Sequence, residues 1–154
     1  MLNSINSDDP QHREAVAAAL FFDTSQAPNG ESDILDGSKT QDALIELLQY
    51  MIAGGWHFEV TSVNTDHGYD GDLGPLCHNP CGMAIDGGLL DGPHPGNYVD
   101  PGTQTFRDFL AYMANAPTLE ATGLGGNYYS AANAAAGKNV FQDNTTPHIH
   151  FQVQ

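Results

Sequence analysis

Two stretches of the chain repeat their hydrophobic residues with the period of an α-helix. The first has apolar side chains at positions i, i+3, i+4 and i+7, which are Leu44, Leu47, Leu48 and Met51. Ser38 and Gln41 form a capping-box pattern before it, and Gly54-Gly55 follow it. The pattern predicts an amphipathic helix that begins at the capping box and ends at the glycine pair.

The second stretch follows Thr103 and ends before Pro117. Its apolar side chains also fall on one helical face, at Phe106, Phe109, Leu110 and Met113. A shorter helix is predicted over residues 11–22, because Asp9-Pro10 supplies a cap and a first-turn proline. Residues 1–9 are expected to form a loose arm, and 130–137, "SAANAAAG", to form another short helix.

Four segments favour β-strands. They are "WHFEVTSV" at 56–63, "GMAIDGG" at 82–88, "TLEATGL" at 118–124 and "HIHFQV" at 148–153. The glycines of the second segment are expected to end it, and residues 23–37 and 64–82 are polar or rich in Gly and Asp, which predicts loops. Helices and strands mix without a regular βαβ rhythm. We therefore expect a small α+β domain, covering residues 1–154, with a largely antiparallel sheet and flanking helices.

Composition and charge limit the classes of function that are expected for this chain. The 154 residues suit one domain, and no run of 18 apolar residues exists, so no membrane span is expected. Four Lys and Arg against 19 Asp and Glu give a net charge of −15. Such a surface repels phosphate backbones and attracts divalent cations, so nucleic acid is not expected as a partner.

The last strand carries two histidines on one face. Side chains alternate along a strand, so one face is apolar and expected to be buried: Ile149, Phe151 and Val153. The other face carries His148 and His150, whose imidazoles lie about 7 Å apart along the strand and can converge on one point in a cleft.

The strand at 82–88 adds a carboxylate to these imidazoles. Ile85 is expected to face the core, so Asp86 points to the opposite side, where His78 can fold back from the preceding loop. Imidazole nitrogens and one carboxylate oxygen are the usual zinc ligands when a fourth position is left to water. The two segments together therefore predict a zinc site, although either one alone is typical of ordinary surface structure.

These segments resemble the lysostaphin, D-Ala-D-Ala peptidase and hedgehog group of zinc peptidases. The resemblance rests on "FEVTSVNTDHG", "LGPLCHNPCGMAIDGG" and "FQDNTTPHIHFQV", and it runs from about residue 40 to the C-terminus. It is closest to the D-Ala-D-Ala carboxypeptidase-like members that bacteriophages carry. It implies Zn²⁺ as the cofactor, in a groove on the sheet.

Carried over residue by residue, the resemblance makes His78, Asp86 and His150 the three zinc ligands. His148 matches a histidine that lies beside the metal, and it would be the catalytic residue that accepts a proton or contacts the oxyanion. His67, in the "NTDHG" loop, would be a further contact to the substrate.

Two departures from the group stand out. Seven residues separate His78 from Asp86, where many carboxypeptidase-type members have six, so this loop must bulge by one. Relatives with an acidic general base place it three residues before the last ligand, where this chain has Pro147. The base is therefore expected to be His148, or Asp143 reaching in from the preceding loop.

The two cysteines, Cys77 and Cys81, flank His78. Three residues lie between them, so a disulfide that closes a small loop is geometrically possible. Free thiols in a reducing compartment and additional metal ligands are the alternatives.

The resemblance implies a peptidase that hydrolyses peptide bonds of bacterial peptidoglycan, as a phage-type endolysin or a virion-associated enzyme. Without a secretory signal peptide, it would stay in the cytoplasm until released, or travel on the virion. A carboxypeptidase needs a cation to hold the terminal carboxylate, and "VTSVNTDHGYDGD" has none, which favours endopeptidase action. The alternatives are a non-catalytic module of a virion or other assembly, and a metal hydrolase of another amide or ester.

Overall fold

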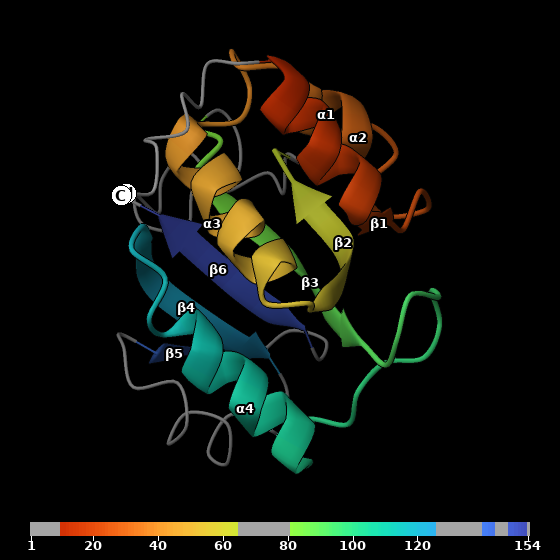
Figure 1. Ribbon diagram of the computed structural model, residues 1–154, viewed down its shortest axis with the longest axis vertical. Coiled ribbons are helices and arrows are strands. Elements are labelled where there is room, and N and C mark those ends of the chain that lie inside the picture. Colours follow the sequence, from red (N-terminus) through yellow and green to blue (C-terminus); the bar gives the residue numbers. More distant parts are fainter. Residues whose placement is uncertain (1–9, 65–80, 126–139, 144–147, 154) are drawn as a thin grey trace.

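A mixed, mostly antiparallel sheet forms the centre of the protein (Figure 1). The structure, a computed structural model, describes residues 10–64, 81–125, 140–143 and 148–153. The strands lie in the order β1 (Phe21–Phe22), β2 (His57–Val63), β3 (Ala84–Leu90), β6 (Ile149–Val153), β4 (Leu119–Gly125) and β5 (Val140–Asp143). β1 runs parallel to β2 and β5 parallel to β4, whereas the three inner pairings are antiparallel.

Four helices are present in the described part of the chain. They are α1 (Pro10–Ala19), α2 (Gly30–Leu35), α3 (Asp42–Ala53) and α4 (Gln104–Met113). Figure 1 shows α3 and α4 in front of the same face of the sheet, with α1 and α2 next to each other near β2. The predicted α+β class, with a largely antiparallel sheet and flanking helices, is confirmed. Among the described residues, no helix combines the length and the apolarity that a bilayer crossing requires.

The hydrophobic core lies between the sheet and these helices. Three fully buried phenylalanines meet there, Phe58 from β2, Phe109 from α4 and Phe151 from β6. Their ring centroids are 5.8 to 6.4 Å apart, and Phe109 meets Phe151 edge to face. Burying each such side chain contributes about 1.5–3 kcal/mol, so this contact ties the central strands to α4.

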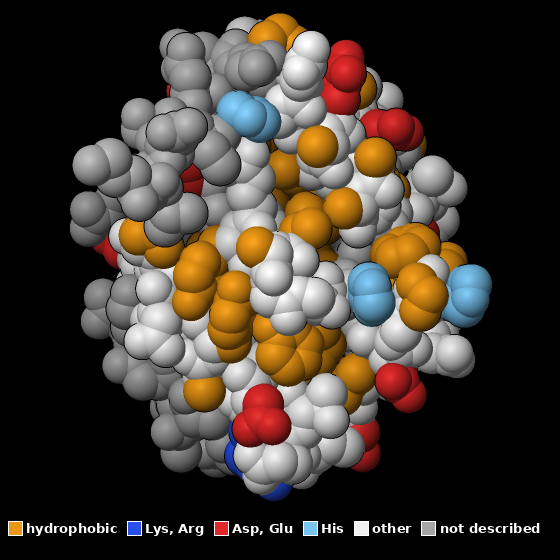
Figure 2. All heavy atoms as spheres, in the orientation of Figure 1, with side chains coloured by type: hydrophobic (Ala, Val, Ile, Leu, Met, Phe, Trp, Pro, Cys, Tyr) orange, Lys and Arg blue, Asp and Glu red, His pale blue; other side chains and the backbone are white. Residues whose placement is uncertain are grey.

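A second aromatic contact joins α3 to α4 at the surface. Figure 2 shows hydrophobic side chains gathered on this side of the molecule. Tyr50 and Tyr112 stack with their ring centroids 4.5 Å apart. The Tyr112 hydroxyl donates to the Tyr50 carbonyl at 2.8 Å, and the Tyr50 hydroxyl donates to the Tyr112 carbonyl at 3.3 Å. Gly54 leaves room for this pair, since a Cβ there would lie 2.5 Å from the Tyr112 ring.

The helix signals were confirmed for α4 and partly wrong for α3. Thr103 caps α4 through its hydroxyl, which accepts from the Phe106 amide at 3.3 Å, and the four predicted apolar side chains of α4 are buried. α3 begins at Asp42 rather than at the predicted capping box, and its Gln41 cap makes no side-chain cap bond. Ser38 instead donates to the Asp36 carboxylate, at 2.9 Å from its amide and 2.6 Å from its hydroxyl. That local turn competes with helix formation and delays the start of α3.

The N-terminal segment also differs from its prediction. The predicted helix over residues 11–22 ends at Ala19, and Phe21–Phe22 pair with Glu59 and Val60 as strand β1. The predicted loop at 23–37 contains α2, a six-residue helix with no side-chain cap. Pairing with a distant strand overrides local helical pattern here, and so short a helix leaves little periodicity to detect. The predicted arm at 1–9 and helix at 130–137 lie outside the described residues.

Strand β3 continues through the two glycines that were predicted to end it. Gly87 and Gly88 are needed there because the Glu59 carbonyl oxygen, 2.1 Å from a Cβ on Gly87, and two aromatic rings occupy the space of their missing side chains. A Cβ on Gly87 would lie 2.4 Å from the Phe58 ring, and one on Gly88 would lie 2.6 Å from the Tyr98 ring. The glycines therefore mark close packing on both faces of the strand rather than its end.

Gly82 holds the segment before β3 against the start of α3. It has a φ of +62°, and its carbonyl accepts from the Gln41 amide at 3.0 Å. A Cβ on Gly82 would lie 2.0 Å from the Lys39 carbonyl oxygen. Gly92 has a similar φ of +82°, but nothing lies within 4 Å of its Cβ position. A side chain at either glycine would strain the backbone, but only a side chain at Gly82 would also collide with a neighbouring segment.

We expect Gly82→Ala to lower the free energy of unfolding by about 3 kcal/mol or more, and Gly92→Ala by only about 1–2 kcal/mol. Both substitutions strain a left-handed backbone, but only the first forces apart the segments that contain Gly82 and Lys39. Urea denaturation of the two variants measures the difference. Equal losses would contradict the close approach at Gly82.

Candidate functional site

Three of the predicted site residues meet on the sheet face opposite the core. Asp86 and His150 lie directly across from each other on β3 and β6. The His150 Nδ1 is 2.7 Å from the Asp86 Oδ1. His148, just before β6, places its Nε2 3.8 Å from the same oxygen. The side chains of the three are only 4 to 14% exposed, so the cluster is largely removed from water.

The neighbouring strands extend this cluster into a row across the sheet. Ser62 of β2 lies opposite Asp86, and Gly123 of β4 lies opposite His150. Cross-strand partners share one face of a sheet, so all four residues belong to the same side. Gly123 has no side chain and is itself buried. The row therefore joins a hydroxyl, a carboxylate and an imidazole on one face of the sheet.

Strand β6 is buried on both faces. The predicted apolar face is confirmed, with Ile149, Phe151 and Val153 at most 2% exposed. The polar face is buried as well, since His150 is 3% and Gln152 is 2% exposed. The Gln152 amide donates to the Glu120 carboxylate at 3.2 Å. Polar contacts in such a setting are stronger than at a solvated surface, because less water competes with them.

The other predicted site residues are described in part or not at all. His67 and His78 lie outside the described residues. Asp143 ends strand β5, opposite Gly125 of β4, instead of lying in a loop as predicted. β4 separates β5 from β6, so the backbone at Asp143 is about 10 Å from that strand. The His148 side chain, by contrast, lies 3.8 Å from the Asp86 carboxylate.

The chemistry of the described pair fits part of a zinc site. Carboxylate oxygen and imidazole nitrogen are zinc ligands, and two ligand atoms on a tetrahedral zinc lie about 3.4 Å apart. Asp86 and His150 are 2.7 Å apart, so in this structure they form a direct hydrogen bond and are closer than two ligands of one zinc ion would be. Within the described residues, no three His, Cys, Asp or Glu side chains are arranged to hold a metal ion. The predicted third ligand, His78, lies outside the described residues.

Three states were predicted for the cysteines: a disulfide, free thiols or additional metal ligands. Cys81 is disulfide-bonded. Cys77 is the only other cysteine in the sequence. A disulfide sulfur is not a thiolate, so Cys81 is excluded as a free thiol and as a metal ligand. Its carbonyl accepts from the Gln41 side chain at 2.9 Å, which links the segment before β3 to α3.

Sequence reasoning missed Tyr98 and Glu59, which adjoin the cluster on the same face. The Tyr98 ring lies against Gly88, and its backbone bridges to Leu90 at the end of β3. Glu59, opposite Gly88 on β2, is only 7% exposed. Burial, together with a hydrogen bond to Glu59, raises the pKa of Tyr98 to about 12. The glycine pair within a strand was the one available sign that another group approaches closely here.

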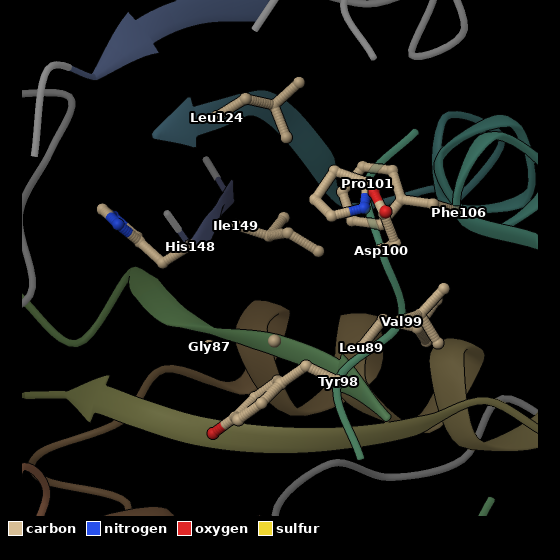
Figure 3. A pocket seen from close by; sticks show the side chains of 11 residues that line it. Gly87, Leu89, Tyr98, Val99, Asp100, Pro101, Phe106, Leu124, His148 and Ile149 are labelled. Atoms are coloured by element: carbon tan, nitrogen blue, oxygen red, sulfur yellow. The ribbon is translucent and has the colours of Figure 1, made fainter. Parts of the chain in front are cut away.

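A pocket of about 430 Å³ opens beside His148 (Figure 3). The backbone of Gly87 and Gly88 forms one side of it, and residues from the segment after β3 form another. Most of its described side chains are apolar: Leu89, Val99, Pro101, Phe106, Leu124 and Ile149. A pocket of this volume is within the range that binds small ligands and single side chains.

No protein-family model, curated protein or solved structure matches this chain. The resemblance to the zinc peptidase group therefore stays a prediction that rests on the quoted motifs.

Tyr98 is expected to titrate near pH 12, about two pH units above an ordinary tyrosine, because burial and Glu59 both disfavour the phenolate. Its folded pKa is raised, so the stability it contributes is present below pH 10 and is lost as the pH rises toward 12. NMR of protein labelled at tyrosine Cζ would follow the ring directly, and Tyr98→Phe would assign its signal. In Glu59→Gln the midpoint should fall toward 10. A wild-type midpoint near 10 would contradict the buried contact.

Proposed function

We propose that this protein is a zinc-dependent peptidase that hydrolyses peptide bonds in bacterial cell-wall peptidoglycan. The main support is the contact between Asp86 and His150, two predicted ligands that are 64 residues apart in sequence and 2.7 Å apart in space. In the proposal His78 supplies the third ligand. A phage-type endolysin or a virion-associated hydrolase is the kind of protein that the motifs favour.

His148 is the catalytic residue of this proposal. Zinc, when bound, would polarise the scissile carbonyl and lower the pKa of water. The His148 Nε2 is 3.8 Å from the same Asp86 oxygen that His150 contacts. From this position the imidazole can accept a proton from the attacking water or donate a hydrogen bond to the developing oxyanion. Its attachment to the first residue of a central strand limits its motion, which favours a preorganised site.

The cations of the described residues favour endopeptidase action. Arg13 is buried and donates to the carbonyls of Ile34 and Thr40 and to Asp42. Lys39 pairs with Asp33, and Arg107 donates to the Gly102 carbonyl and to Gln104. None of the three lines the pocket beside His148. Holding a terminal carboxylate, as a carboxypeptidase must, would need such a cation there.

A non-catalytic module of a virion or other assembly is the second candidate. The burial of His150 and Gln152 favours this structural role, because buried polar residues can fix the strand register without taking part in any reaction. In that case the Asp86–His150 contact would hold β3 to β6, and a metal, if any, would only stabilise the fold.

Substitutions at the cluster separate metal binding from catalysis. We expect His150→Ala and Asp86→Ala to lose zinc, measured by elemental analysis of protein purified without added metal. His148→Ala should keep zinc but clear purified cell walls about 10²- to 10⁴-fold more slowly, since a general base typically contributes that factor. His94→Ala is the matched control, because His94 is exposed and outside the cluster. Zinc retained in His150→Ala would contradict the ligand set.

A chelator distinguishes the two candidate functions. For the peptidase, removing zinc should abolish the clearing of cell walls, and adding zinc back should restore it. The melting temperature should also fall, because bound metal stabilises the folded state. A lower melting temperature in a protein that never cleared cell walls would instead support the structural module.

A further inference from the structure

We propose that the pocket beside His148 binds an uncharged, apolar side chain of the peptide, next to the bond that is cleaved. This inference rests on the proposed function, because it takes His148 as the catalytic residue. It adds a preference that the zinc site alone does not supply. The pocket and Tyr98 at its edge would then determine which peptide bond is presented to His148.

The pocket and the cluster share His148. In Figure 3 His148 lies at one end of the pocket with its ring directed away from the other labelled side chains, and Ile149, the next residue, points away from His148 into the pocket. Leu124 of β4 closes one side, and Gly87 and Gly88 of β3 form the opposite side without side chains. Because His148 is part of the lining, a side chain that enters here lies next to this residue.

The charges around the pocket select against anions. Asp100 is the only charged residue among its described lining, and its Oδ1 already accepts from the Gly102 amide at 2.8 Å. No Lys or Arg is among the described residues that line it. A carboxylate bound here would lose hydration without gaining a cation, close to Asp100 and in a chain of net charge −15. An apolar side chain has no such cost and removes apolar surface from water.

Tyr98 forms an outer wall that suits the same occupant. Among the described residues it is one of two large hydrophobic side chains that are exposed, at 52%, and its ring occupies the space beside Gly88. Its phenol is neutral at physiological pH, as that of an ordinary tyrosine also is. A neutral aromatic wall around an apolar pocket favours contact with a hydrocarbon side chain.

Binding of single amino-acid amides tests the preference without any catalysis. Metal-free, ¹⁵N-labelled protein would be titrated with N-acetyl-leucinamide, N-acetyl-lysinamide and the anionic N-acetyl-glutamic acid α-amide. We expect the leucine compound to shift the amide signals of Gly88, Val99 and Leu124 to saturation. The glutamic acid compound should bind at least about tenfold more weakly, because its carboxylate must be desolvated. The lysine compound should bind more weakly than the leucine compound.

Three variants test whether the amides bind in this pocket. Val99→Trp fills it from a partly exposed position and should remove the saturable shifts. Leu35→Trp is the matched control, since Leu35 is exposed at 43% on α2 and does not line this pocket. Tyr98→Ala leaves the core intact and should weaken binding of the leucine compound at least about threefold by removing the wall, so the test does not depend on Val99→Trp folding.

The outcomes keep this inference apart from the proposed function. Equal binding of the three amides, shifts that do not saturate, or binding unchanged in Tyr98→Ala would overturn the pocket assignment, even if cell walls are cleared. Selective leucine binding by a protein that hydrolyses no cell wall would support the pocket and reject the peptidase. Selective binding that Val99→Trp removes and Leu35→Trp does not would support it directly.

Discussion

The contact between Asp86 and His150 depends on the register of two central strands. β3 and β6 are antiparallel, and the pair that faces the core, Ile85 opposite Phe151, is directly followed by the pair that faces away, Asp86 opposite His150. A slip of one residue would move the carboxylate or the imidazole into the hydrophobic core. Burial of the apolar residues thus determines the strand register, and this register places Asp86 opposite His150.

Aromatic packing and glycines give the two faces of the sheet different characters. On the core face, Phe58 and Phe151 fill the space beneath α4, and Gly87 makes room for the Phe58 ring. On the opposite face, the Tyr98 ring covers Gly88, and Asp86 contacts His150. One face is therefore packed with apolar side chains, while the other carries a largely buried carboxylate and imidazole beside an aromatic ring.

The distribution of charge links the two proposals. The chain has a net charge of −15, and its described arginines and lysines are bound to groups away from the cluster. This balance suits a divalent cation at Asp86 and an uncharged side chain in the adjacent pocket. It is less suited to gripping an anionic polymer or a terminal carboxylate, so recognition is expected to depend on short uncharged parts of a peptide.

Periodicity and alternation in the sequence determined α4 with its Thr103 cap, the strands β2 and β6, and the sharing of one face by Asp86 and His150. These features follow from the spacing of apolar and polar residues over a few positions, because helices and strands repeat with fixed periods. Only the tertiary structure decided that Phe21–Phe22 join the sheet, that β3 passes through its glycines, and that Tyr98 lies against Gly88 beside a pocket. Each of these depends on a partner far along the chain, and local preference is weaker than the burial gained from such a partner.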